Sequence, residues 1–131
     1  MEHALELLSA ETELEQKISD SLSEQKWAAK ASVVFYWTMV AYRAEWRYGI
    51  YAHRVALIDA GHLGQNLYLA ANGIGLGCCG IAAFEHEICC RMLEVDGEEE
   101  YPVYTMPVGT VSEANKEAEQ EFYRFVREQN L

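Results

Sequence analysis

Apolar and polar residues follow first a helical and then a strand-like spacing along the first half of the chain. Residues 33–40 are a continuous run of β-branched and aromatic side chains, which predicts a buried strand. Residues 42–49 mix aromatic and basic side chains, and we interpret them as a loop or a short helical turn. Residues 4–30 are predicted to form a helix or a helical pair, because apolar side chains recur there at helical spacing, namely Leu7, Leu14, Ile18 and Leu22.

A long helix is predicted from about residue 51 to residue 73, and its side chains are apolar nearly all round. A helix with this pattern is expected to bury all of its faces. In so small a domain, burial on every side implies a second subunit. Small residues at Ala60, Gly61 and Gly64 would allow another helix to approach closely.

Shorter elements are predicted after this helix. Residues 77–84 are interpreted as a loop that enters a short strand, and residues 85–93 as a short helix. A turn follows at Asp96-Gly97. Residues 102–108 are typical of a second strand, closed by Gly109.

Ser112 suits the N-cap of a last helix, because its hydroxyl can accept a hydrogen bond from a free N–H of the first turn. The chain therefore reads as one domain over residues 1–131, in an α-β-α-β-α-β-α order. It comprises an N-terminal helical segment (1–30), a core (31–109) and a C-terminal helix (110–131). The last helix should carry its apolar side chains on one face, which are Phe122, Phe125 and Val126.

The length of 131 residues fits a single domain, and a 50% share of apolar residues is enough for a core. The net charge of −11 argues against a nucleic-acid partner and against an anionic membrane surface, both of which require clustered cations. Polar residues interrupt the apolar stretch from Val55 to Ile74, so a membrane span is not expected. Because no signal peptide is visible, we expect a cytoplasmic protein.

The four cysteines form two adjacent pairs, Cys78-Cys79 and Cys89-Cys90. Adjacent cysteines do not have the spacing of common zinc ligands. We interpret them as small buried apolar residues in a reducing compartment, with no metal site. A thiol redox or metal site is the alternative.

Gly75, Gly77 and Gly80 formally satisfy the dinucleotide-binding pattern G-x-G-x-x-G. That site requires the glycines after a strand and before a helix, whereas here they follow a helix and precede a strand, so we reject it. Two compatible explanations remain. One glycine could end the helix with positive φ while the others permit a tight turn, or a flat ligand could approach backbone that carries no Cβ.

A wider pattern of ordered segments extends over residues 27–109. It consists of Trp46-Arg-Tyr-Gly49, Tyr51-x-x-Arg54, Asp59-Ala-Gly-His-Leu-Gly-Gln-Asn-Leu-Tyr-Leu-Ala-Ala71, Gly75-Leu-Gly77, Gly80-Ile-Ala-Ala-Phe84, Leu93-Glu-Val-Asp-Gly-Glu-Glu99 and Tyr104-Thr-Met-Pro-Val-Gly109. This pattern resembles the nitroreductase superfamily, and within it the branch of SagB-type and azoline-oxidising dehydrogenases. The resemblance implies an α+β fold in which a central β-sheet is flanked by helices, with an intertwined homodimer and FMN bound at the dimer interface.

The resemblance assigns a cofactor role to the glycine-rich loop. Its backbone would face the flavin ring near N5 and hydrogen-bond to it. Arg54 could reach a phosphate or carboxylate, or else pair with Asp59. The expected cofactor-binding residues are thus Gly77, Gly80, Ile81, Ala82, Ala83 and Arg54.

Arg47 and Tyr48 match a Lys-Tyr pair that azoline-oxidising members are proposed to use for proton abstraction. Arginine stays protonated and is a poor general base, which argues against azoline oxidation, although Tyr48 could still exchange a proton. Alternatively, Arg47 forms an ion pair and Tyr48 packs at the interface.

His62, amid apolar neighbours, is predicted to be a hydrogen-bonded core or interface residue.

Such proteins bind the FMN phosphate with a basic segment that has no counterpart in residues 1–30. Lys17 is the only lysine or arginine among the first 25 residues. We therefore expect the carboxy-terminal half of such an enzyme, truncated at the N-terminus. The predicted function is FMN-dependent hydride transfer from NAD(P)H to a small-molecule acceptor. The alternatives are half of a split flavoenzyme with a missing partner chain, weak FMN binding, or a cofactor-free dimerisation or binding module.

Overall fold

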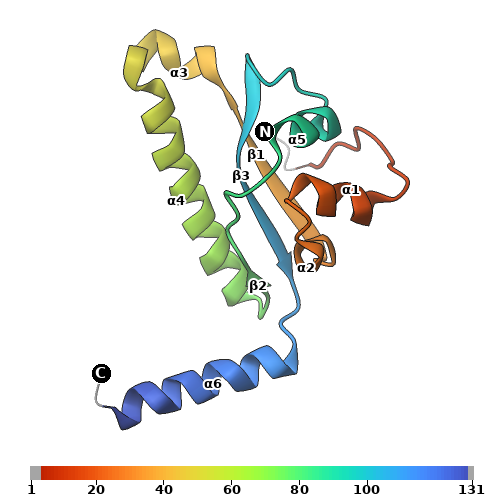
Figure 1. Cartoon of the computed structure of the whole chain (residues 1–131). Helices are drawn as coiled ribbons and strands as arrows, with labels where there is room; N and C mark the ends of the chain where they lie inside the picture. Colours follow the sequence, from red (N-terminus) through yellow and green to blue (C-terminus); the bar gives the residue numbers. More distant parts are fainter. Residues whose placement is uncertain (1–3, 130–131) are drawn as a thin grey trace.

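A three-stranded antiparallel sheet lies at the centre of the computed structural model, which describes residues 4–129 (Figure 1). Its strands lie in the order β1 (Val33–Val40), β3 (Glu100–Gly109) and β2 (Gly77–Cys78). The two long strands pair along their whole length, with one irregularity between Trp37 and Thr38. Both strands predicted from apolar runs are therefore confirmed, although β3 begins two residues earlier than expected.

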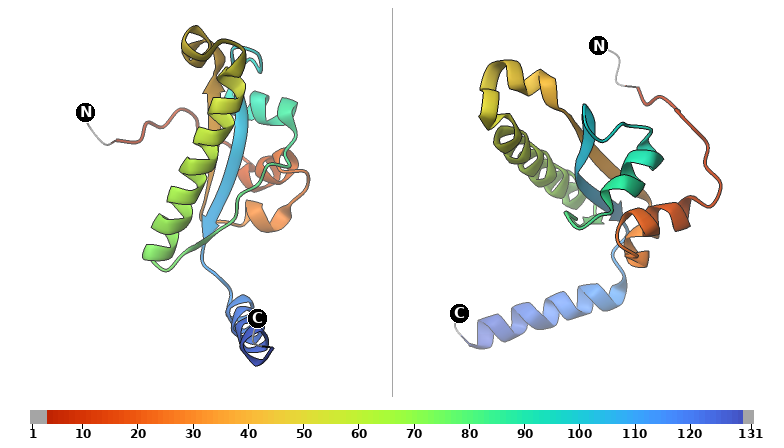
Figure 2. Two further views of the ribbon diagram at one scale, coloured as in Figure 1. Left: turned by 90° about the vertical axis from the view of Figure 1, so that its left-hand side faces the viewer. Right: turned by 45° about the horizontal axis from the view of Figure 1, so that its top comes forward.

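The N-terminal region forms two short helices, α1 (Leu14–Ser21) and α2 (Lys26–Ala29). They pack with α5 on one side of the sheet, and α4 covers the other side (Figure 2). The predicted helical pair is thus confirmed from residue 14 onward. It is wrong for residues 4–11, which have no regular structure: Leu5, Leu7 and Leu8 are exposed, and a short helix without tertiary packing is marginal in water.

After β1 the chain turns through α3 (Ala41–Tyr48) and the 3-10 turn η1 (Gly49–Tyr51) into the long helix α4 (Ala52–Gly73). Of the two interpretations of residues 42–49, the helical one is confirmed, and the helix is longer than a single turn. Gly49 allows the change of direction because its φ of 53° lies in the left-handed region.

Helix α4 buries only one face within the chain. Ala60 and Gly64 are buried against the sheet, where a Cβ on Gly64 would lie 2.8 Å from the ring of Tyr104. These two small residues therefore bring the helix close to its own sheet rather than to another helix. Gly61 has open space around it. Large apolar side chains are exposed around the rest of the helix, namely Leu57, Ile58, Leu63 and Leu69.

A left-handed glycine ends α4. Gly75 has a φ of 75°, its N–H donates to the Asn72 carbonyl at 3.0 Å, and the Leu76 N–H donates to the Ala71 carbonyl at 2.9 Å. These two bonds define a Schellman cap, so the helix-ending explanation for one of the glycines is confirmed. Strand β2 begins directly after this cap. The prediction that the loop precedes the strand is wrong, because the loop follows β2.

Helix α5 (His86–Leu93) and the turn after it lead into β3. The turn is held by the Asp96 carboxylate, which accepts hydrogen bonds from the N–H groups of residues 98, 99 and 100. The core lies under α1 and α5, where Leu22, Ala28 and Ile81 are buried together.

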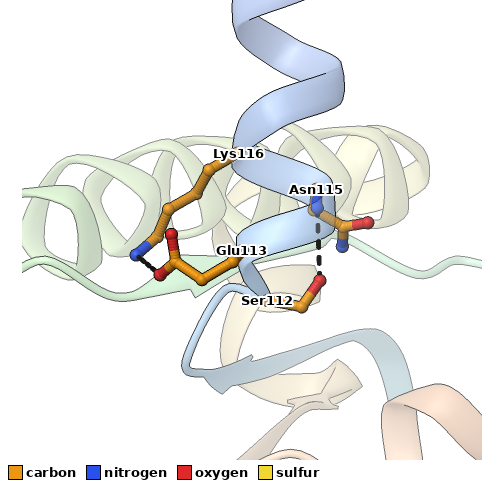
Figure 3. A network of polar contacts seen from close by, with 4 residues as sticks. All are labelled: Ser112, Glu113, Asn115 and Lys116. Atoms are coloured by element: carbon orange, nitrogen blue, oxygen red, sulfur yellow. Dashed lines mark hydrogen bonds and ion pairs between the residues drawn. The ribbon is translucent and has the colours of Figure 1, made fainter.

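The C-terminal helix α6 (Glu113–Glu128) extends away from the rest of the chain (Figure 1). Ser112 is its N-cap, as predicted: the hydroxyl accepts a hydrogen bond from the Asn115 N–H at 3.3 Å (Figure 3). Lys116 also pairs with Glu113 at 2.7 Å.

Candidate functional site

The glycine-rich loop between β2 and α5 is held at several points of its backbone. The Cys79 N–H donates to the Pro107 carbonyl at 3.2 Å. Ile81 and Thr105 exchange two backbone hydrogen bonds of 2.8 and 3.1 Å. At the far end, the Glu85 N–H donates to the Ser21 carbonyl at 2.9 Å. These bonds fix the loop along the edge of β3.

Two exposed backbone donors lie between these fixed points. The Ala83 carbonyl accepts a hydrogen bond from the Gln25 amide at 3.2 Å. The N–H groups of Ala82 and Ala83 have no hydrogen-bond partner within residues 4–129, and both residues are exposed. Because the backbone is fixed on each side, these donors are available to an acceptor outside the chain without prior reorganisation.

Two tyrosines hold Gly80, and neither was predicted to be a site residue. The Gly80 N–H donates to the Tyr68 hydroxyl of α4 at 2.7 Å. The Tyr104 hydroxyl occupies the place where a Cβ on residue 80 would be. Partial burial raises the pKa of the Tyr104 phenol, and the nearby Tyr68 phenol raises it further.

The glycines of the loop are thus required by the chain's own side chains. At Gly77 an added Cβ would lie 2.5 Å from a methyl group of Val111, just as one at Gly80 would meet Tyr104. Close packing inside the chain accounts for Gly77 and Gly80, and neither explanation drawn from the sequence had included it. An approach by a flat ligand stays a prediction.

A groove of about 330 Å³ lies beside the start of the loop. Its lining includes Trp27, Lys30, Cys79 and Asn115. Lys30 supplies a cation to this groove, and the half-exposed ring of Trp27 supplies a flat apolar surface. The groove therefore has the chemistry to hold an anionic group next to an aromatic one.

Arg47 and Tyr48 lie at the other end of α4 from the loop. The Arg47 guanidinium lies 5.7 Å from the centre of the Tyr48 ring, and Tyr48 is 42% exposed. Tyr68 lies sixteen positions after Ala52 in the helix, which corresponds to about 24 Å along the helix axis. One chain therefore does not bring the two predicted parts of the site together.

The alternative roles suggested for the arginines and for His62 are not found inside the chain. Arg47 and Arg54 form no ion pair with any described residue, and Arg54 instead lies 4.9 Å from the centre of the Tyr51 ring. His62 is exposed, with its Nδ1 2.9 Å from the Ile58 carbonyl oxygen. The hydrogen bond of His62 is confirmed and a place in the core is wrong, whereas a place at an interface stays a prediction.

The two cysteine pairs lie in different environments. Cys89 and Cys90 are buried, in agreement with the interpretation as small apolar residues. Cys79 is exposed and Cys78 is half-buried, so that interpretation is wrong for the first pair. Across the described part of the chain, no three metal-binding side chains come together, and no helix is long and apolar enough to cross a membrane.

An α+β domain with a long helix on one face of an antiparallel sheet, and a fixed loop along the edge of the sheet's longest strand, defines the nitroreductase-like class of fold. The chain belongs to the nitroreductase family, whose model matches residues 1–110. The resemblance to this family seen in the sequence is thereby confirmed.

Individual relatives agree with this assignment. A nitroreductase-family protein of Methanocaldococcus jannaschii is 37% identical over 62 residues, which are 47% of this chain and 30% of that protein. A nitroreductase-family structure from Anabaena variabilis matches with a TM-score of 0.70 and 28% identity, over 77% of this chain and 20% of that one.

The microcin synthetase complex McbBCD of Escherichia coli, solved with a truncated form of pro-MccB17 bound, contains a similar fold. Its TM-score is 0.67 at 24% identity, over 75% of this chain and 38% of that one. At this identity the likeness concerns the fold alone. The chain spans between a fifth and two fifths of the length of these three relatives.

Proposed function

We propose that the protein is an FMN-dependent oxidoreductase of the SagB-type branch, acting in the cytoplasm as a homodimer on a small-molecule acceptor. Bound FMN would supply hydride transfer from NAD(P)H to the acceptor. Family membership supports a flavin site. The observation that carries the proposal is the pair of N–H groups at Ala82 and Ala83, which have no hydrogen-bond partner among the described residues and lie on a loop that is fixed at both ends.

In this proposal the loop orients the flavin ring. The N–H groups of Ala82 and Ala83 donate toward ring acceptors such as N5, while Gly80 and Ile81 hold the loop against α4 and β3. Gly77 keeps β2 close enough to its neighbours for this geometry. A donor that is already in place loses little entropy when it binds, which favours a flat ligand at this position.

Tyr48 and Arg47 would handle the proton that accompanies reduction of the acceptor. The Tyr48 phenol would donate the proton, and the Arg47 guanidinium lies 5.7 Å from the centre of its ring. Arg47 itself stays protonated and does not act as the base. Arg54, on the first turn of α4, would bind the FMN phosphate or a carboxylate of the acceptor.

These roles require two copies of the chain. A twofold axis across α4 places the N-terminal end of one helix beside the C-terminal end of the other. Tyr48 of one copy would then face the loop of its partner, which the length of α4 prevents within one chain. Exposed apolar side chains of α4 on the sides turned away from the sheet, such as Ile58 and Leu69, would supply the apolar surface for this contact.

A cofactor-free dimerisation or binding module is the second candidate, and one observation favours it. Tyr104 and Val111 account for Gly80 and Gly77 without any ligand. The same observation fits half of a split flavoenzyme, in which a missing partner chain would contribute the phosphate site.

The first experiment is a visible absorption spectrum of the purified protein before and after adding FMN, followed by gel filtration. We expect flavin bands to elute with the protein and to bleach on addition of NADH or NADPH. As matched variants we suggest Ala82→Pro, which removes one donor, and Ala10→Pro, which lies in the exposed segment without regular structure. If the wild-type protein fails to retain FMN at saturating concentration, the enzyme proposal is wrong for this chain alone.

The dimeric site is tested by mixing two inactive variants. Tyr48→Phe damages one part of the site and Ala82→Pro the other. In a shared site, a mixed dimer keeps one intact site of two, so random mixing restores about a quarter of wild-type NAD(P)H oxidation. Recovery of no activity, with mixed dimers shown to form, would place both parts in one chain.

A further inference from the structure

The groove beside the start of the loop carries a positive charge in a strongly acidic chain. Lys30 lines it and forms no ion pair with any described residue. The sequence holds 21 acidic residues, but none of those within residues 4–129 lines this groove. An anion therefore meets a cation here without a competing carboxylate, which is not expected of a general surface in a chain with a net charge of −11.

Two further side chains give the groove the means to recognise a ligand. Trp27 contributes a ring that is 54% exposed. Asn115 uses its backbone N–H to cap α6, and its side-chain amide takes no part in the hydrogen bonds shown in Figure 3. The amide can therefore donate to a ligand in the groove. A volume of about 330 Å³ suits a small molecule rather than a segment of another protein.

Cys79 places a nucleophile at the same groove, and its thiol is exposed. The backbone of Cys79 is held, because its N–H donates to the Pro107 carbonyl at 3.2 Å. The sulfur makes only a weak contact of 3.8 Å with the Gly80 carbonyl oxygen. The thiol is thus kept at the edge of the groove and stays accessible to a reagent, as a reactive cysteine requires.

The other three thiols are less suited to this chemistry. Cys78 precedes Cys79 on an extended segment, where consecutive side chains point to opposite faces. Cys78 is half-buried, and burial raises the pKa of its thiol, as does the adjacent Cys79 thiol. Cys89 and Cys90 are buried. Cys79 is therefore the thiol that combines full exposure with a cation in the same groove.

These groups together suit an exchange reaction with a small anionic disulfide. The Cys79 thiolate attacks one sulfur of the disulfide, a new S–S bond forms to Cys79, and the other half leaves as a thiolate. The leaving thiolate takes up the proton that Cys79 lost, so the small disulfide is the only oxidant that the step needs. Lys30 and Asn115 would hold a carboxylate of the retained half, and the Trp27 ring would cover its apolar part.

We propose that this groove binds low-molecular-weight disulfides that carry carboxylates, and that Cys79 forms a reversible mixed disulfide with them. The modification adds an anionic group directly before Gly80, at the start of the loop. An excess of a reducing thiol reverses it by the same exchange. The inference goes beyond the proposed function and does not depend on it, because no flavin takes part in the exchange.

The test compares two reagents on the full-length protein: dithiobis(nitrobenzoate), which carries two carboxylates, and dithiodipyridine, which is neutral. Stopped-flow absorbance gives the second-order rate constant of the fast phase, which Cys79→Ser should remove. We expect Lys30→Glu to slow the anionic reagent about tenfold and Lys30→Gln about threefold, while the rate of the neutral reagent changes by less than about twofold.

Lys26→Glu is the matched control. It alters the net charge by the same amount as Lys30→Glu, but Lys26 lies at the start of α2 and does not line the groove. Both rates should therefore stay unchanged. As a second readout, the wild-type protein is incubated with oxidised glutathione, a peptide disulfide that carries carboxylates. Mass spectrometry should find one adduct, located on Cys79 and removed by dithiothreitol.

Three results would overturn the inference. Equal slowing by Lys26→Glu and Lys30→Glu would show that net charge alone acts on the reagent. Equal slowing of both reagents by Lys30→Glu would show that Lys30 affects the thiol and not the bound anion. A glutathione adduct on another cysteine, or none, would remove Cys79 from this role. None of these results bears on FMN retention, so the proposed function is judged separately.

Discussion

The hydroxyl of Tyr104 fills the space that a side chain at Gly80 would need. The ring carbon that bears it lies 2.7 Å from the position of a Cβ on residue 80, so even the smallest side chain must displace the ring or the loop. Because the loop is fixed to β3 through Ile81, it has little freedom to move away.

We therefore expect Gly80→Ala to lower the free energy of unfolding by about 1–3 kcal/mol, as overpacking does elsewhere. Urea denaturation measures this effect. Adding Tyr104→Phe should recover part of the loss, because the oxygen is removed while the ring carbon remains. Gly73→Ala is the control: nothing lies within 4 Å of its Cβ, and it should stabilise the helix by about 0.5–1 kcal/mol. Equal effects at the two glycines would contradict the packing described.

Glu94 ends α5 in a left-handed conformation, with a φ of 57°. The Val95 N–H donates to the Cys90 carbonyl at 3.0 Å across this cap. Glycine adopts such a conformation without steric cost, so Glu94→Gly should raise the free energy of unfolding by about 1 kcal/mol. Glu98→Gly is the control and should not raise the free energy of unfolding, because residue 98 does not have a positive φ. A loss of stability in the Glu94 variant would show that its side chain has another role.

Alkaline pH should unfold the protein through two groups near Ser21. Burial raises the pKa of the Cys89 thiol from 9.0 to about 11 and that of the Tyr36 phenol from 10.0 to about 12. Both groups are neutral when protonated, so folding favours the protonated forms, and their contribution to stability is complete below pH 9. It is lost as the pH rises from 9 to 12.

Denaturation curves at several pH values measure this loss. Cys89→Ala should reduce the loss of stability between pH 9 and 11. Tyr36→Phe should reduce the loss of stability between pH 10 and 12. The Tyr36 variant leaves the Ser21 hydroxyl bonded to the Ile18 carbonyl at 2.9 Å, which limits other damage. A stability that does not change up to pH 12 would be inconsistent with burial of these groups.

The thiols should react at very different rates with a disulfide reagent in the folded state. Cys79 is exposed and should react first, whereas Cys89 and Cys90 are buried and should react only on unfolding. Burial also raises the pKa of the half-buried Cys78 thiol, which slows its reaction. Cys79→Ser should remove the fast phase. Rapid labelling of all four thiols in the native protein would contradict the burial of Cys89 and Cys90.

Local patterns in the sequence were sufficient to predict most elements. The apolar run of residues 33–40 became β1, and Ser112 caps α6 as its hydroxyl suggested. Such features depend on neighbours within a few positions. Residues 4–11 show the limit of this reasoning, because apolar spacing alone does not stabilise a helix that has no surface to pack against.

The arrangement around Gly80 could not be predicted in the same way. Tyr68 and Tyr104 lie 12 and 24 positions away in the sequence, and only the pairing of β2 and β3 beneath α4 brings them to the loop. Nothing in the local pattern distinguishes these two tyrosines from the others. The separation of Tyr48 from the loop likewise follows from the length of α4, whose boundaries the sequence did predict.

The hydrogen bond from Gly80 to Tyr68 has a consequence for regulation, because it joins the loop to α4, the helix through which the proposed dimer would form. The loop and α4 would then respond together. A ligand that binds the loop would affect α4, and a subunit that packs on α4 would affect the loop. Thermodynamic reciprocity then requires that, if the ligand strengthens association, association strengthens ligand binding by the same factor. Protein concentration itself would act as an effector of such a site.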